Sequence, residues 1–208
     1  MSEVRLAPLG RIRARLRVPG DKSISHRALI LNAVAEGSAR VTGLAPGLDV
    51  RSTVAALAAL GAEIVPAADG GVSVTGPKAW KARGPVDCGN SGTTARLLLG
   101  ALAPRAEGEI VLDGDESLRR RPMDRVARPL AAMGAEIAAR NAPGRLPLAV
   151  CGRPLSGARH RPEVASAQAK SALIAARVAD AANKQNRVVV VFDEGFDHHQ
   201  QKCQAGES

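Results

Sequence analysis

Aromatic residues are scarce in this sequence. Trp80, Phe192 and Phe196 are the only ones in 208 residues, and tyrosine is absent. Proteins that bind single-stranded nucleic acid stack its bases on aromatic rings, so the sequence excludes such a platform. Acidic residues are fewer than basic ones, 20 against 29, and the formal charge of +9 favours an anionic partner. Because the arginines are scattered and form no basic tail, we expect a small anionic metabolite and not nucleic acid.

Cysteines and long apolar runs are scarce as well. The cysteines, Cys88, Cys151 and Cys203, are odd in number and widely spaced, which is typical of a reducing cytoplasm and not of a disulfide framework. No apolar run approaches the roughly 18 residues of a membrane-spanning helix, and no signal peptide is recognised. With 45% hydrophobic residues available for a core, we expect a globular cytoplasmic protein with no membrane partner.

One polar stretch carries most of the chemical information. It leads into an apolar segment and reads Pro19-Gly20-Asp21-Lys22-Ser23-Ile24-Ser25-His26-Arg27. Pro-Gly ends the preceding element and three capable N-cap residues follow, so the pattern predicts a helix over 23–35. A helix start presents unpaired N–H groups that suit an anion. Ser23 and Arg27 share a helix face there, with Lys22 beside them, so one phosphate or carboxylate is within reach of all three.

An ordinary solvated helix end with a serine cap is the alternative to an anion site. A nucleotide-binding P-loop is excluded, because that motif needs a glycine five residues before a Gly-Lys pair. Here Arg15 stands five residues before Gly20, and Asp21 separates Gly20 from Lys22.

Residues 11–18 alternate strictly between arginine and an apolar side chain. This period of two predicts a strand that carries its arginines on one face. A solvated outer face is favoured over a binding stripe for these arginines.

The rest of the chain shows a regular succession of strand and helix signals. Strands are predicted at 39–42, 62–65, 72–75 and 110–112. One helix is predicted from Asp49, as its N-cap, through Leu60, with Gly61 just past its end.

Three further helices are predicted in the second half. The first begins in the polar cluster at 90–94 and ends near Leu102, and the next has Pro122 as its first residue and ends at Gly134. Ser166 begins a third, alanine-rich helix that runs through about residue 179.

The order of elements repeats along the chain. Ala58-Ala59-Leu60-Gly61-Ala62-Glu63-Ile64 matches Ala131-Ala132-Met133-Gly134-Ala135-Glu136-Ile137, and Arg27 aligns with Arg96. Each unit is predicted to be strand, helix, strand, helix, strand, strand, with whole units at about 20–80 and 85–153 and an incomplete third at 160–179. Because the first helix of each unit begins with a polar capping cluster, we expect these helix starts to converge and to concentrate positive potential.

Four separated motifs resemble the family of 5-enolpyruvylshikimate-3-phosphate synthases, which transfer the enolpyruvyl group of phosphoenolpyruvate to shikimate 3-phosphate. They are Pro19 to Arg27, Gly89-Asn90-Ser91-Gly92-Thr93-Thr94-Ala95-Arg96, Glu116-Ser117-Leu118-Arg119-Arg120-Arg121-Pro122-Met123 and Ser166-Ala167-Gln168-Ala169-Lys170-Ser171. The sister family that acts on UDP-N-acetylglucosamine has Lys-Asn where Lys22-Ser23 stands here. The resemblance implies an α/β lobe of the enolpyruvyl transferase fold, and a transferase of the shikimate pathway of chorismate and aromatic amino acid biosynthesis. It implies no cofactor and no metal, and it makes the protein a relative of the target of glyphosate.

The resemblance also implies roles for residues on the shikimate 3-phosphate side. Lys22 is expected to contact both substrates and is the catalytic candidate, since it supplies a compact charge near the reacting centre. Ser23 and Arg27 are expected to hold shikimate 3-phosphate, Arg27 through paired hydrogen bonds to an oxyanion. The segment that binds the phosphate and ring is matched by Ser166, Ala167 and Gln168. Without the other motifs, Gln168 is an exposed glutamine at a helix start.

On the phosphoenolpyruvate side, the resemblance implies roles for Asn90, Gly92 and Thr93 as lining residues and for Arg121 as the residue that grips the substrate. Gly92 has a steric reason to be glycine, because a side chain there intrudes where the backbone meets a ligand.

The resemblance covers residues 1–179. Members of the family have two lobes of three units each, with the active site between them, and the second lobe supplies an aspartate and a glutamate near the reacting carbon. Because these acid-base groups have no counterpart here, we expect the chain alone to bind without turnover and to need a complementary second lobe as its partner. A non-catalytic module that binds a phosphorylated metabolite and an inactive truncated fragment are the alternatives.

Residues 180–208 do not resemble the family. The segment 188–192 is typical of a strand, and the remainder is polar and irregular. Candidate metal ligands there are Asp197, His198, His199 and Cys203. Adjacent histidines point in different directions in a helix or a strand, so a frayed or foreign tail is the favoured interpretation. A truncated gene, a frameshift and an artificial sequence all produce such a break.

Overall fold

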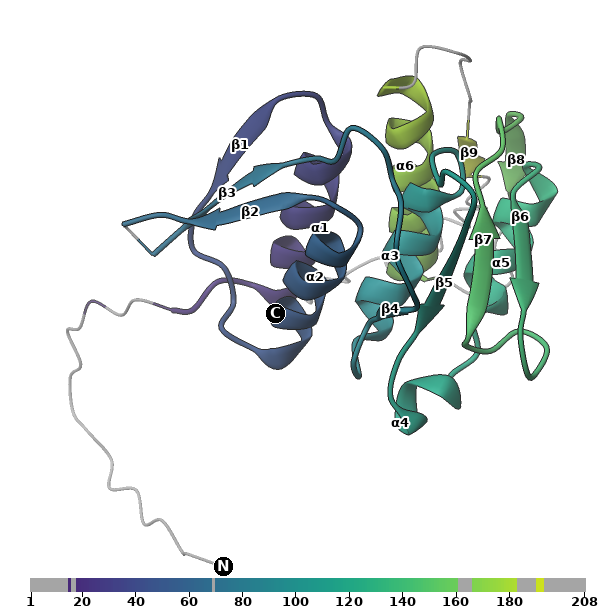
Figure 1. Cartoon of the computed structure of the whole chain (residues 1–208), viewed down its shortest axis with the longest axis horizontal. Coiled ribbons are helices and arrows are strands. Elements are labelled where there is room, and N and C mark those ends of the chain that lie inside the picture. Colours follow the sequence, from purple (N-terminus) through teal and green to yellow (C-terminus); the bar gives the residue numbers. More distant parts are fainter. Residues whose placement is uncertain (1–14, 16–17, 69, 161–165, 183–189, 193–208) are drawn as a thin grey trace, which may run out of the picture.

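The computed structural model describes residues 15, 18–68, 70–160, 166–182 and 190–192. Of the three sheets in these ranges, the three-stranded and the four-stranded sheet lie on either side of a central group of helices (Figure 1). No helix in these ranges is long and apolar enough to cross a membrane.

The first unit contains two helices and one sheet. Helices α1 (Lys22–Val34) and α2 (Leu48–Ala59) pack against each other. The strands are β1 (Ser38–Val41), β2 (Glu63–Pro66) and β3 (Val72–Thr75), and the sheet has the antiparallel order β1-β3-β2.

The second unit repeats this arrangement and adds to it. Its elements are β4 (Val86–Asp87), α3 (Gly92–Leu102), β5 (Glu109–Asp113), α4 (Glu116–Arg119), α5 (Asp124–Ala132), β6 (Glu136–Ala139) and β7 (Leu148–Cys151). The sheet order is β4-β5-β7-β6, in which β5-β7-β6 is antiparallel and β4 is parallel to β5. Since β5-β7-β6 has the pairing of β1-β3-β2, the repeat predicted from the letters is present in the topology. The predicted strand 11–18 lies mostly outside the described residues, and Arg15 and Val18 are not in a strand.

A third unit begins in the same way. Helix α6 (Ala167–Ala182) lies between β8 (Ala158–His160) and β9 (Val190–Phe192) in the chain. The strands β8 and β9 pair in parallel, as β4 and β5 do around α3. The predicted strand 188–192 is therefore observed over its last three residues, and residues 188 and 189 lie outside the described part.

Two predicted helix starts are wrong. Helix α2 has Gly47 as its N-cap, and Asp49 lies in the first turn, where its carboxylate accepts a hydrogen bond from Lys22 instead of capping the helix. Helix α5 begins at Asp124 and not at Pro122. The pattern also missed α4, a short helix that Asp115 caps by accepting a hydrogen bond from the Leu118 N–H at 2.7 Å. Because α4 ends at Arg119, Pro122 and Met123 belong to the turn that connects α4 to α5 and are not part of α5.

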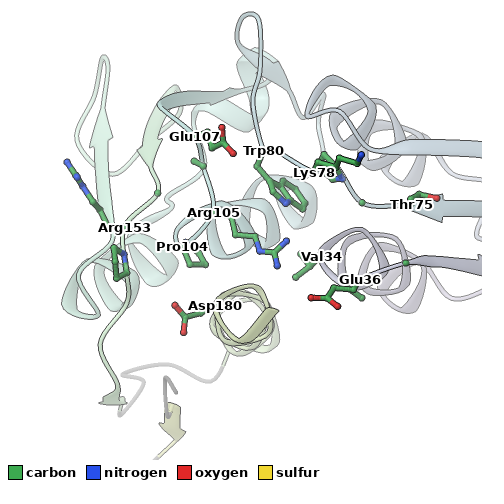
Figure 2. Close-up of a pocket in the computed structure, with 17 residues that line it drawn as sticks. Val34, Glu36, Thr75, Lys78, Trp80, Pro104, Arg105, Glu107, Arg153 and Asp180 are labelled. Carbon is green, nitrogen blue, oxygen red and sulfur yellow. The ribbon is translucent and has the colours of Figure 1, made fainter. Parts of the chain in front are cut away.

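A cavity of about 680 Å³ opens where three helices end (Figure 2). It is lined by Val34 at the end of α1, by Pro104 and Arg105 just after α3, and by Asp180 near the end of α6. We call this region the end pole.

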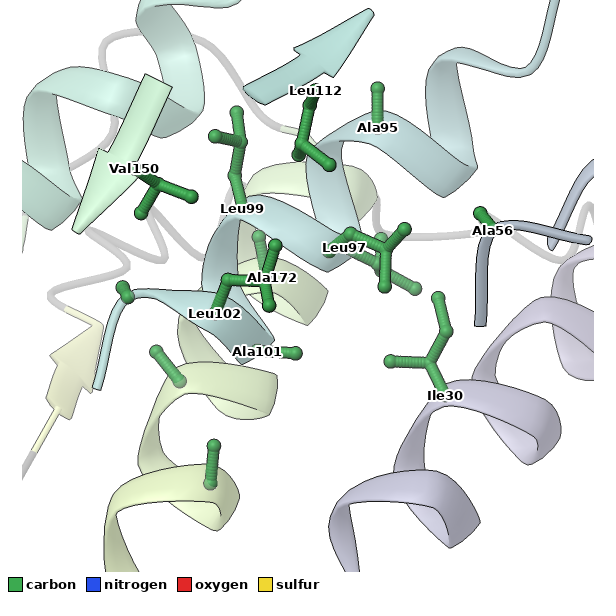
Figure 3. Close-up of a cluster of buried hydrophobic side chains, with 14 of the residues drawn as sticks. Ile30, Ala56, Ala95, Leu97, Leu99, Ala101, Leu102, Leu112, Val150 and Ala172 are labelled. Carbon is green, nitrogen blue, oxygen red and sulfur yellow. The ribbon is translucent and has the colours of Figure 1, made fainter. Parts of the chain in front are cut away.

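The core is centred on α3, which is buried on nearly every side (Figure 3). Its leucines pack against Ile30 of α1 and against the sheet residues Leu112 and Val150. At Gly100 a Cβ atom would lie 2.0 Å from the carbonyl oxygen of Ala172, so α3 and α6 approach closely. The small side chains of the alanine-rich α6 permit this approach, and the two helices run together through the core.

Candidate functional site

The first turns of α1, α3 and α6 lie together, as the capping clusters predicted. Arg27 of α1 donates to the hydroxyl of Ser171 on α6 through Nε at 3.0 Å and Nη2 at 2.7 Å. Gln168 of α6 donates through Nε2 to the hydroxyl of Thr93 on α3 at 2.9 Å. We call this region the start pole and define it by 22–27, 92–96 and 167–171.

Helix α1 begins at the start pole with a side-chain cap. The Asp21 carboxylate accepts a hydrogen bond from the Ile24 N–H at 2.7 Å. Lys22 is the first helical residue, its ammonium is 2.9 Å from the Asp49 carboxylate, and its side chain is 58% exposed. Ser23 is also exposed beside it. An exposed ion pair of this kind contributes little, so an incoming anion can compete for Lys22.

Arg27 is held in one orientation by neutral partners. Besides its two bonds to Ser171, it donates through Nη1 to the Ser23 carbonyl oxygen at 2.9 Å. The Ser171 hydroxyl in turn donates to the Ala167 carbonyl oxygen at 2.7 Å, so its oxygen is free to accept from Arg27. Each guanidinium nitrogen of Arg27 thus uses one N–H, and each terminal nitrogen keeps an N–H for an oxyanion. Sequence reasoning gave Ser171 no role, although it lies in one of the motifs.

Gln168 is the second residue that the tertiary structure fixes. Its Oε1 accepts from Arg96 Nη1 at 2.8 Å, while its Nε2 donates to Thr93. The hydroxyl of Ser166 accepts from the Ala169 N–H at 3.3 Å and caps α6. Sequence reasoning assigned no site role to Arg96, although its alignment with Arg27 in the repeat was a signal that it lies near the site.

The residues predicted on the phosphoenolpyruvate side lie beside α3. Arg121 donates to the Asn90 carbonyl oxygen at 3.2 Å, to the Asn90 side-chain oxygen and to the Ser117 hydroxyl at 3.3 Å. The Asn90 amide nitrogen donates to the Asp115 carboxylate at 2.7 Å, and this bond is the main cause that lowers the pKa of Asp115. Asp115 therefore sets which face of the Asn90 amide turns toward Arg121, a role that the sequence pattern missed.

Gly92 lies between two arginines. A Cβ atom at this position would be 2.6 Å from Nη1 of Arg96 and 3.6 Å from Nη1 of Arg121. The structure therefore gives Gly92 a steric reason in addition to the predicted approach of a ligand, because a side chain would displace the Arg96 guanidinium.

A buried chain of hydroxyl groups underlies the start pole. His26 Nδ1 lies 2.6 Å from the Thr53 hydroxyl, which lies 2.7 Å from the Thr94 hydroxyl, and Thr94 donates to Ser91 at 2.7 Å. This series of hydrogen-bonded side chains joins α1, α2 and the N-cap of α3. Burial lowers the pKa of His26. In a sequence, such buried residues can be recognised only as polar side chains on an otherwise apolar helix face.

The end-pole cavity contains none of the predicted site residues. Its charged lining is mixed and comprises Glu36, Glu107, Asp180, Lys78, Arg105 and Arg153. Within the described ranges, no group of histidine, cysteine, aspartate and glutamate residues could hold a metal ion. The candidate ligands Asp197, His198, His199 and Cys203 lie outside those ranges.

The chain has clear relatives of known activity. It matches the family model described as EPSP synthase (3-phosphoshikimate 1-carboxyvinyltransferase) over residues 6–190. A 3-phosphoshikimate 1-carboxyvinyltransferase of Synechococcus sp. (strain CC9605) is 53% identical over 171 residues, which are 80% of this chain and 39% of the relative. The protein of that name from Thermus thermophilus is 49% identical over 179 residues, 85% of this chain and 42% of the relative.

Solved structures agree with these relatives. A 2.37 Å structure of EPSP synthase from Acinetobacter baumannii matches with a TM-score of 0.72 and 38% identity, over 78% of this chain and 37% of that chain. The predicted α/β enolpyruvyl transferase fold is confirmed. The chain spans 39 to 42% of the length of the curated relatives described above. The family model extends past residue 179, where the resemblance was expected to end, and reaches the first residue of β9.

Proposed function

We propose that this chain, which belongs to the EPSP synthase family, binds shikimate 3-phosphate at its start pole and forms half of a 3-phosphoshikimate 1-carboxyvinyltransferase site. The observation that carries the proposal is that three helix starts are bonded to one another by Arg27, Arg96 and Gln168. Helix starts attract anions, and here they are joined by side chains that still have N–H groups to donate.

Each predicted residue has a role in this proposal. Ser23 and Arg27 bind shikimate 3-phosphate together with Ser166, Ala167 and Gln168 of the α6 start. Lys22 lies between the substrates, and its mobile ammonium exchanges Asp49 for a substrate oxyanion as negative charge develops.

Phosphoenolpyruvate binds on the neighbouring side of α3, next to Asn90, Gly92, Thr93 and Arg121. Arg121 supplies the positive charge there, and the bond between Asp115 and Asn90 positions it.

The variant Arg27→Ala tests the proposal. We expect it to weaken the binding of shikimate 3-phosphate in calorimetry by about 1.5 to 3 kcal/mol, roughly ten- to a hundredfold, because a charge-assisted hydrogen bond is lost. Arg153→Ala is the matched control, since Arg153 lines the end-pole cavity and is paired with Glu136. Equal affinity of wild type and Arg27→Ala would show that the assignment of Arg27 is wrong.

Binding without turnover by residues 1–208 alone is the second part of the proposal. The acid-base carboxylates that the resemblance assigns to a second lobe match no residue of this chain. The test is phosphate release from both substrates by this chain, by a second lobe of a related enzyme, and by their mixture. We expect release from the mixture alone, and rapid release by this chain alone would contradict the proposal.

We also propose that the described units form one lobe, which extends through β9 instead of ending at residue 179. The parallel pairing of β8 with β9 and the family match to residue 190 support this extension. We place the protein in the cytoplasm, which is consistent with the free thiols of Cys88 and Cys151. Burial raises the pKa of Cys88 to about 12, so this thiol is unreactive.

A further inference from the structure

Arg96 is a buried cation with neutral partners. Its side chain belongs to the core-facing surface of α3, and the residue is only 7% exposed. It donates to Gln168 Oε1 at 2.8 Å, to the Pro122 carbonyl oxygen at 3.0 Å and to the Gly92 carbonyl oxygen at 3.4 Å. Its Nε has no hydrogen-bond partner among the described residues.

No carboxylate compensates this charge among the residues that the structure describes. The charged groups that act on Arg96 are Arg125 and Arg121, both of the same sign. Burial is the main cause that lowers the pKa of Arg96, and these two arginines lower it further. A buried charge is costly unless it is paired, so a guanidinium that no described carboxylate compensates is suited to an anionic ligand as its counter-ion.

The position of Arg96 shows where such a counter-ion would lie. Its guanidinium lies against Gly92 in the first turn of α3, close to the Arg121 guanidinium. The α3 start adds its own positive potential there. All of these groups favour an anion at the start pole.

Arg96 also determines whether Gln168 presents an N–H donor or a carbonyl oxygen to that anion. Because the Gln168 oxygen accepts from Arg96, the amide nitrogen faces Thr93, and one N–H of this nitrogen is left over. With the opposite orientation, Gln168 would present a carbonyl oxygen, which repels an oxyanion.

We propose that Arg96 is a positioning residue whose uncompensated charge is neutralised by the substrate oxyanion and whose hydrogen bond turns the Gln168 amide toward that oxyanion as a donor. The proposal rests on the proposed function, because it takes the shikimate 3-phosphate site as its setting. It has one distinctive consequence: an anion should stabilise the folded chain through Arg96, whereas Arg96 should not stabilise the anion-free chain.

The test compares Arg96→Met, Arg96→Lys and wild type in calorimetry and in thermal unfolding, with and without shikimate 3-phosphate at constant ionic strength. We expect Arg96→Met to bind at least about tenfold more weakly. We expect its melting temperature without ligand to stay within about 2 °C of wild type or to rise, and the ligand-induced rise to disappear. Arg96→Lys keeps the charge and should keep at least half of that rise.

Arg105→Met is the matched control. Arg105 is also a partly buried arginine with a pKa lowered chiefly by burial, but it lies at the end pole and donates to the Ala179 carbonyl oxygen at 2.9 Å. It should keep the full ligand-induced rise. If Arg96→Met does not fold, Arg96→Gln replaces it, because glutamine keeps amide donors without the charge.

Two outcomes separate this inference from the proposed function. If wild type does not bind shikimate 3-phosphate, the proposed function fails and the inference fails with it. The inference alone is overturned if wild type binds and the uncharged variant binds equally well. It is also overturned if the uncharged variant loses stability without ligand but keeps the full ligand-induced rise in melting temperature, because Arg96 is then merely structural.

Discussion

The two poles of the helix group differ in shape and in charge. The end pole has the 680 Å³ cavity, yet acidic and basic side chains balance there and three helix ends contribute negative potential. The start pole contains none of that cavity, but Lys22, Arg27 and Arg96 gather there around helix starts, and Arg121 lies beside Gly92 of α3. Among the described residues, the 680 Å³ cavity and the proposed site therefore lie at different poles, and the proposal rests on the distribution of charge.

The reason for this separation is the common direction of α1, α3 and α6. Parallel helices add their dipoles, so that one pole attracts anions while the other repels them. The end-pole cavity is lined by none of the predicted site residues.

The largest effect is expected from breaking the contact that holds the helices together. Gly100→Ala places a methyl group 2.0 Å from the Ala172 carbonyl oxygen, so α3 and α6 must separate. We expect a loss of about 3 kcal/mol in the free energy of unfolding, at the upper end of the range for overpacking, measured by urea denaturation. The start pole should lose its affinity for shikimate 3-phosphate as well.

Gly84→Ala is the control for this prediction, because nothing lies within 4 Å of a Cβ atom there. Full stability of Gly100→Ala would mean that the close approach of α3 to α6 does not hold the start pole together.

A smaller effect is expected from pH, through His26 beneath the start pole. Burial lowers its pKa below the ordinary value of 6.5, so below pH 6.5 the unfolded chain binds more protons than the folded chain. The stabilisation is complete above pH 6.5 and decreases as the pH falls toward the lowered pKa. Asp49 opposes this shift, whereas Lys22 and Arg27 add to it.

Urea denaturation of wild type and His26→Asn between pH 7.5 and 5 measures this dependence. The variant should lose less stability than wild type on acidification, although it is less stable at pH 7.5. Identical pH dependence in the two proteins would show that His26 does not contribute.

The smallest effect is expected from an exposed ion pair at each pole. Asp49→Asn releases Lys22 at the start pole and should tighten the binding of shikimate 3-phosphate by about 0.2 to 1 kcal/mol at low salt. Glu107→Gln releases Lys81 from a similar pair of 2.8 Å beside the end pole and should leave affinity unchanged. Equal changes in both variants would indicate a general effect of net charge, and the comparison of the poles would lose its support.

The sequence by itself determined the repeat and the places where α1, α3 and α6 begin. Capping residues such as Asp21 and Ser91 act within three residues of the chain, and helix periodicity extends over four, so both can be recognised in the letters. The motifs around Lys22, Asn90, Arg121 and Ser166 identified the family because they are local runs of residues. The misplaced starts of α2 and α5 show the limit: Asp49 is a good cap by type, but its carboxylate turns to Lys22.

Only the tertiary structure decided how the site residues are held. Ser171 lies 144 residues from Arg27, and Gln168 lies 72 residues from Arg96, so no local pattern connects them. That no carboxylate of the described part of the chain pairs with Arg96 is likewise a property of packing, because the sequence contains many carboxylates and does not say which of them come near. Charge and capping are properties of single residues and their neighbours in the chain. Whether a buried charge has a counter-ion, and how a site side chain is oriented, depend instead on which helix faces meet in the folded core.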